Sequence, residues 1–152
     1  MDIPLFPLKT VLFPDGVLPL RVFEPRYVDM VRECMKSNAP FGVCLITQGG
    51  EVGAPARTHE VGCLAAIESW DMRELGVLLI RARGGQRFRI GARRVEADGL
   101  QRAQVETIEP DTDEAIAPEH AGCVGVLRRV IADLEAQREE GAESPIGGPH
   151  RL

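Results

Sequence analysis

The stretch that decides the fold runs from Leu5 to Tyr27 and reads LFPLKTVLFPDGVLPLRVFEPRY. Proline recurs among its apolar residues, and because proline cannot donate a hydrogen bond to a β-ladder, the stretch predicts edge strands or irregular extended segments. Within it, Pro14-Asp15-Gly16 is typical of a turn, so two extended segments are expected to pair. Glu24-Pro25 predicts the start of a helix, since proline is tolerated at the first helical position.

The chain from residue 27 to residue 110 alternates short apolar stretches with turn signals. Apolar positions at helical spacing between Tyr27 and Met35 predict a helix that ends near Asn38, ahead of Pro40. Strands are then expected at residues 41–47, 61–70, 77–82, 86–90 and 101–108, and turns at the glycines 49, 50, 53, 84, 85 and 91. The fold class is therefore α+β and mostly β.

The domain organisation follows from a change of composition after Pro110. We expect a β-barrel domain over residues 1–110, an acidic linker over 111–117, a helix over 118–141 that packs on the barrel, and a loose tail over 142–152. The helix is predicted to be amphipathic because apolar residues follow helical spacing along it. These residues are Val124, Leu127, Val130, Ile131 and Leu134.

The composition is that of an ordinary globular chain. Of its 152 residues, 44% are hydrophobic and 27% are charged. The longest apolar runs, such as residues 77–80, are far below the roughly 18 residues that span a bilayer, so no membrane partner is expected. A secretory signal begins with basic residues and continues with an uninterrupted apolar stretch. The N-terminus of this chain instead carries an acid, and prolines interrupt its apolar stretch, which predicts a cytoplasmic protein. A net charge of −5 disfavours a nucleic-acid partner without excluding one.

Residue patterns for catalysis and for metal binding are absent from the sequence. The cysteines at 34, 44, 63 and 123 form no C-x-x-C pair, and no H-E-x-x-H pattern places two histidines on one helical face. None of the serines lies in a G-x-S-x-G turn. We therefore expect no catalytic residue, no bound metal and no cofactor.

Several blocks of the sequence, taken in their order along the chain, resemble one known family. Residues 5–27, 41–43, 60–65 and 85–90 resemble the Lon-protease N-terminal (LON substrate-binding) domain family, and the chain is similar to its stand-alone bacterial members over residues 2–109. The resemblance implies a PUA-like pseudo-barrel of about six strands, with a helix after the second extended segment and a C-terminal amphipathic helix. In Lon this domain helps to capture unfolded protein. The sequence has no G-x-x-x-x-G-K-[ST] phosphate loop and no room for a Ser-Lys protease domain, so a non-catalytic module is expected.

The favoured hypothesis is recognition of peptides or unfolded proteins, through an apolar groove or an open sheet edge. The side chains that motivate it are Leu5, Phe6, Phe13 and Leu18, although burial in the core is the commoner fate of such residues. The expected partners are polypeptide substrates or partner proteins. The oligomeric state is left open.

Two alternatives remain. A basic stripe between Arg81 and Arg102 could bind RNA or an anionic ligand, with Arg81 and Arg83, and likewise Arg87 and Arg89, on shared strand faces. Acids near these arginines favour a salt-bridged surface instead. The chain could also be a protein–protein adaptor that docks through the apolar stripe of its last helix.

Overall fold

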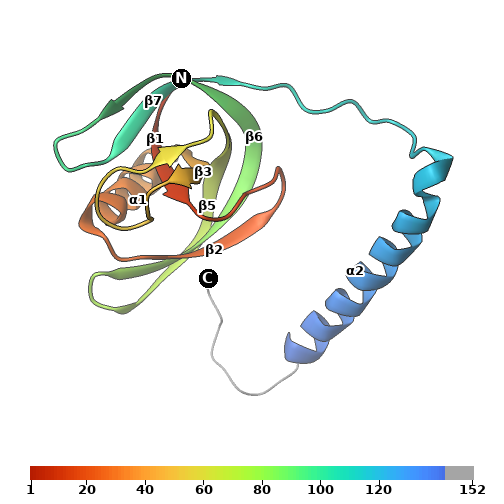
Figure 1. Cartoon of the computed structure of the whole chain (residues 1–152). Helices are drawn as coiled ribbons and strands as arrows, with labels where there is room; N and C mark the ends of the chain where they lie inside the picture. The colour runs from red at the N-terminus through yellow and green to blue at the C-terminus, as the bar shows by residue number, and fades with distance from the viewer. Residues whose placement is uncertain (143–152) are drawn as a thin grey trace. The chain divides into compact units, whose positions relative to one another are not determined.

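The computed structural model describes residues 1–142 of the chain. Its elements are β1 (Asp2–Leu8), β2 (Val17–Val22), α1 (Pro25–Ser37), β3 (Phe41–Gln48), β4 (Arg57–Thr58), β5 (Val61–Glu74), β6 (Val77–Val95), β7 (Gln101–Thr107), a 3-10 turn (Pro118–His120) and α2 (Ala121–Ala142). Residues 1–110 form one compact unit, and a second unit begins at Asp111 (Figure 1). The predicted loose tail lies, from residue 143 onward, outside the described residues.

The sheet closes on itself because β1 has two strand partners (Figure 1). Residues 5–8 of β1 pair in parallel with β3, and residues 2–4 pair antiparallel with β7. Together with β6 and β5 these strands complete a ring, β1–β7–β6–β5–β3, while β2 pairs with β6 and β4 with β3. The expected pseudo-barrel is confirmed. The described residues contain seven strands. Two details differ from the prediction: the stretches at 77–82 and 86–90 form one strand, β6, and the two-residue β4 was not foreseen.

Two of the side chains predicted to bind peptide lie in the core of this barrel. Leu5 is fully buried, and Phe6 is 5% exposed. The Phe6 ring stacks on Tyr27 with 4.2 Å between the ring centroids. Burial of apolar side chains on both faces of β1 stabilises the barrel, so Leu5 and Phe6 serve packing rather than an exposed peptide site.

Helix α1 forms for the reasons that its sequence suggests. Pro25 occupies its first turn, and Val28, Val31 and Cys34 turn one buried stripe toward the core. The helix ends at Ser37, and the left-handed backbone of its C-cap Asn38 (φ 53°) lets the next N–H, that of Ala39, donate to the carbonyl of Cys34 at 3.0 Å. Asparagine tolerates this conformation better than most residues, which explains why the helix stops there.

The long strand β6 corrects the prediction of turns at Gly84, Gly85 and Gly91, all of which lie within it. A Cβ on Gly84 would stand 2.1 Å from the backbone oxygen of Phe13, so the glycine lets another segment approach the strand. Glycine inside a strand often marks such a close approach. Gly49 and Gly53, with φ of 101° and 93°, do lie in the predicted loop.

The second unit contains α2, and four of the five residues of its apolar stripe are exposed, Val124 being the exception. Leu127 is 59% exposed and Leu134 is 54% exposed. The packing of this helix on the barrel, and its use as an adaptor surface, stay predictions. Within residues 1–142, no helix combines the length and the apolar character needed to cross a membrane.

Candidate functional site

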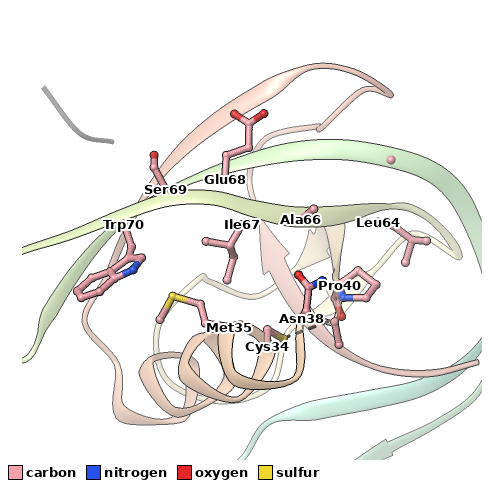
Figure 2. A pocket seen from close by; sticks show the side chains of 12 residues that line it. Cys34, Met35, Asn38, Pro40, Leu64, Ala66, Ile67, Glu68, Ser69 and Trp70 are labelled. Atoms are coloured by element: carbon pink, nitrogen blue, oxygen red, sulfur yellow. Dashed lines mark hydrogen bonds between the residues drawn. The ribbon is translucent and has the colours of Figure 1, made fainter.

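A hollow of about 450 Å³ separates the C-terminal end of α1 from β5 (Figure 2). We call it the α1–β5 hollow. Its lining residues are Cys34, Met35, Asn38, Ala39, Pro40, Leu64, Ala66, Ile67, Glu68, Ser69, Trp70 and Gly85. Its volume falls in the range of ordinary ligand sites, and most of its lining side chains are apolar.

A β-bulge determines which side chains of β5 face the hollow. The register of β5 against β6 shifts between Ile67 and Ser69. Residues three apart in a regular strand point to opposite faces, but the extra residue of a bulge restores the same face. Ile67 and Trp70 accordingly both point toward α1, where Met35 lies (Figure 2). Trp70 is 53% exposed and is the only tryptophan of the chain.

One edge of β5 is open beside this hollow. On the side of α1, β3 pairs with β5 only at residues 63–65, whereas β6 pairs with the other side along the whole of β5. From Ala66 to Glu74, β5 therefore has a strand partner on one side alone within the described part of the chain. An open edge presents backbone N–H and C=O groups that another extended chain can pair with.

Cys34 and Glu68 are the thiol and the carboxylate among the residues that line the hollow. Burial raises the pKa of the Cys34 thiol to about 11, so the thiol is not ionised near neutral pH and is a poor nucleophile. The Glu68 carboxylate pairs with Arg83 and lies 3.6 Å from Arg81 Nε, so both arginines occupy it. Across residues 1–142, no group of three or more potential metal ligands comes together.

The four side chains predicted to bind peptide are not brought together. Phe13 is 69% exposed and lines a separate hollow of about 210 Å³ with Leu12, Pro14 and Val61. Leu18 is half-buried against the core. Sequence reasoning missed the α1–β5 hollow, because the isolated Trp70 resembled an ordinary residue at the end of a strand.

The predicted basic stripe is largely a salt-bridged surface. Arg81 and Arg83 share Glu68, as described above, and Arg83 also donates to the carbonyl of Asp15 at 3.0 Å. Arg87 and Arg89 lie farther along β6, opposite residues 63 and 61 of β5. The neutralised charge at Arg81 and Arg83 gives no support to the anionic-ligand alternative.

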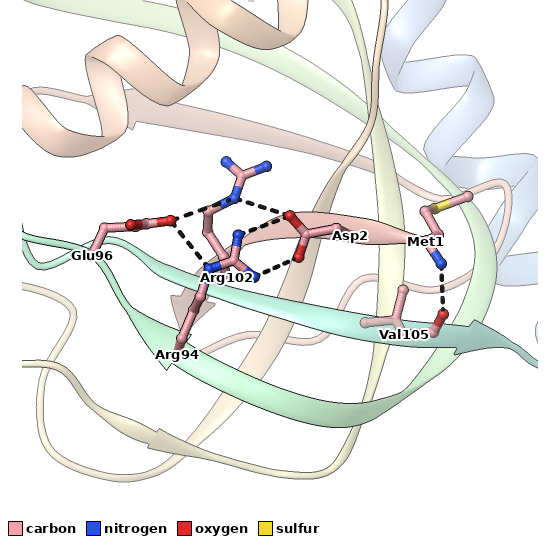
Figure 3. A network of polar contacts seen from close by, with 6 residues as sticks. All are labelled: Met1, Asp2, Arg94, Glu96, Arg102 and Val105. Carbon is pink, nitrogen blue, oxygen red and sulfur yellow. Dashed lines mark hydrogen bonds and ion pairs between the residues drawn. The ribbon is translucent and has the colours of Figure 1, made fainter.

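A second charged network fixes the N-terminus of β1 (Figure 3). Asp2 accepts hydrogen bonds from Arg94 Nη1 at 2.8 Å and Nη2 at 2.9 Å. Arg102 Nε lies 3.5 Å from the same carboxylate, and Glu96 also contacts both arginines. The bidentate contact with Arg94 lowers the pKa of Asp2 from 3.8 to about 2. This network joins β1, β6 and β7 at the point where the barrel closes.

We expect Asp2→Asn to change how stability depends on pH. Because the pKa of Asp2 is lower in the folded protein than in the unfolded chain, the carboxylate stabilises the fold above pH 3.8 and stops doing so as the pH falls toward 2. The gap in unfolding free energy between wild type and Asp2→Asn should thus narrow over this interval. Urea denaturation at a series of pH values measures the gap. Parallel curves down to pH 2 would contradict the assignment, and Arg94→Met should reproduce the narrowing.

The fold is a closed, β-rich barrel with one helix set beside an open strand edge of the described residues. A family model, the ATP-dependent protease La (LON) substrate-binding domain, matches residues 2–144. The chain belongs to this family.

Similar proteins agree with that assignment. A Lon N-terminal domain protein from Xanthomonas campestris has a solved structure that is 41% identical and superposes with a TM-score of 0.75, covering 87% of this chain and 74% of that one. Lon protease 1 of Bdellovibrio bacteriovorus is 31% identical over 87% of this chain, and cereblon of Gallus gallus is 31% identical over 75%. The chain spans only 17% of that Lon protease and 26% of that cereblon. The N-terminal domain of Mycobacterium avium complex Lon protease, 15% identical with a TM-score of 0.59, shows the same fold.

Proposed function

We propose that the chain recognises polypeptide segments, such as those that unfolded proteins expose, and binds them in the α1–β5 hollow. The observation that carries the proposal is the half-exposed Trp70, which stands with Ile67 and Met35 over an apolar hollow. Large aromatic side chains beside a pocket are typical anchors of binding surfaces. Membership of a substrate-binding family supports the same reading. The proposed role is recognition without chemistry.

A short extended peptide tests the proposal. We choose a capped, fluorescein-labelled heptapeptide, Thr-Leu-Thr-Phe-Thr-Leu-Thr, which presents apolar side chains on one face when extended. Binding should raise its fluorescence anisotropy, and the unlabelled peptide should shift the emission of Trp70, the single tryptophan. The protein should also suppress aggregation of a reduced, unfolded client protein. If it fails to bind the peptide and also fails to protect the client, the proposal is wrong.

Trp70→Ala should weaken peptide binding by at least about tenfold, because truncating an aromatic anchor typically costs about 2 kcal/mol or more and about 1.4 kcal/mol corresponds to tenfold. Leu75→Ala provides a matched control, since Leu75 is 98% exposed and lies outside the hollow. Phe13→Ala tests the separate hollow that the sequence pointed to. If wild type and Trp70→Ala bind the peptide with equal affinity and Phe13→Ala binds it more weakly, the peptide site lies at Phe13 and its assignment to the α1–β5 hollow is wrong.

A further inference from the structure

We infer that the bound segment adds to the open edge of β5 as an extra strand, with its side chains directed into the α1–β5 hollow. The inference rests on the proposed function and goes further, because it specifies the partner as an extended, uncharged, apolar stretch of polypeptide. Helical or folded partners are thereby excluded. Three features of the structure support it.

The first feature is that the backbone of β5, and not only its side chains, borders the hollow. Five consecutive residues, Ala66 to Trp70, line it. If only side chains lined the hollow, every second residue of β5 would line it, because neighbouring side chains of a strand point to opposite faces. Glu68 and Ser69 point away from α1 (Figure 2), so the part of these residues that reaches the hollow is their backbone.

The second feature is the position of the hollow along the line of β3. Strand β3 runs antiparallel to β5 and begins at Phe41, opposite Ala65. Beyond Phe41 the chain turns through Pro40 into the end of α1. The hollow begins where β3 leaves β5, since it is lined by Pro40 and Ala39 on one side and by Ala66 on the other. An added strand would therefore continue the line of β3 beside β5, at the usual spacing of about 4.8 Å.

The third feature is the state of the charges along the open edge. Glu68 is paired with arginines of β6, and Asp71 Oδ2 lies 3.1 Å from Arg73 Nε. Glu74 lies 3.7 Å from Arg21. With these acids paired inside the chain, the edge offers a partner backbone groups and apolar surface rather than net charge. An uncharged apolar segment is complementary to such a surface, and its affinity should depend little on salt.

Backbone methylation of the peptide tests strand addition directly. In an extended peptide, alternate N–H groups point to the same edge, so only one set faces β5. We compare two forms of the heptapeptide with identical side chains, one N-methylated at its leucines and phenylalanine and the other at its internal threonines. One form should lose at least about tenfold in affinity, and the other should bind nearly as well as the parent, since its methyl groups point to solvent.

The outcomes separate the binding mode from the proposed function. If the parent peptide binds in a Trp70-dependent way but both methylated forms bind equally, strand addition is wrong and polypeptide recognition stands. If neither the parent peptide nor an unfolded client binds, the proposed function itself has failed.

Amide hydrogen exchange supplies a second measurement on the full chain. Peptide binding should slow exchange at the amides of Ala66, Ile67, Glu68 and Trp70 that point away from β6, because the open edge of β5 becomes paired. Amides of β7, which already has β1 and β6 as neighbours, provide the internal control. If the edge amides are instead protected without peptide, and increasingly so at higher protein concentration, a second copy of the chain occupies the edge and the inference is overturned.

Discussion

Replacing Arg26 by alanine is expected to lower the free energy of unfolding by about 3–5 kcal/mol, because the change removes one partner of a buried ion pair. Arg26 is only 8% exposed, and its Nε lies 2.9 Å from Glu24 Oε2. Its other two nitrogens donate to the carbonyls of Gly99 at 3.0 Å and Gly53 at 2.7 Å. One guanidinium therefore joins the start of α1 to two turns that are far apart in sequence.

The cost is large because of what the substitution leaves behind. Without Arg26, the carboxylate of Glu24 and the two carbonyls lose their partner in a confined place. The guanidinium also lies over the Tyr27 ring, 4.7 Å from its centroid, so a stacking contact is lost as well. Arg26→Lys should recover only part of the loss, since an ammonium group cannot reproduce the planar fork.

Urea denaturation followed by circular dichroism measures this effect. Arg21→Ala is the matched control, because Arg21 is 61% exposed and its contact with Glu74 is a surface pair worth at most about 1 kcal/mol. The transition midpoint should move by more than about 1 M for Arg26→Ala and hardly at all for Arg21→Ala. Equal midpoints for the two variants would show that Arg26 does not have the structural role described.

Local sequence patterns predict the elements of the barrel well. The start of α1 at Pro25 and its end beside Asn38 depend on neighbouring residues, and each lies where the sequence suggests. The pairing expected across the turn at Pro14-Asp15-Gly16 does not form, because β1 pairs with β3 and β7 and β2 pairs with β6. The burial of Arg26 could not be predicted from the sequence, for the opposite reason. Its carbonyl partners, Gly53 and Gly99, are 27 and 73 positions away, so no local pattern reveals them.

The position of the candidate site could not be predicted from the sequence, because it too depends on contacts between distant segments. The open edge of β5 exists because β3 begins opposite Ala65, which is a matter of register between strands. The common direction of Ile67 and Trp70 depends on a bulge, whereas simple alternation would place them on opposite faces. The family resemblance predicts the fold and the kind of function, but the position of the proposed site follows only from the pairing of strands.

Gly84→Ala is expected to destabilise the barrel by about 3 kcal/mol, the upper end of the cost of overpacking. Its new Cβ would stand 2.1 Å from the carbonyl oxygen of Phe13 and 2.9 Å from the carbonyl carbon, and backbone cannot move aside as a flexible side chain can. The displacement would also disturb two hydrogen bonds that fasten the turn before β2. In these, Asp15 N donates to the Gly84 carbonyl at 2.9 Å and Gly84 N donates to the Gly16 carbonyl at 2.8 Å.

The neighbouring glycine supplies the control for this prediction. Gly85 lies in the same strand, but a Cβ there would meet Leu64 at an ordinary 3.7 Å, so Gly85→Ala should change the unfolding free energy by no more than about 0.5 kcal/mol. Neither glycine has a left-handed φ, and the comparison therefore isolates the close approach of the Phe13 backbone from any conformational need for glycine. Thermal and urea unfolding of the two variants would decide between these causes. Equal destabilisation of both would mean that β6 requires glycine for its backbone path, and that the contact with Phe13 is incidental.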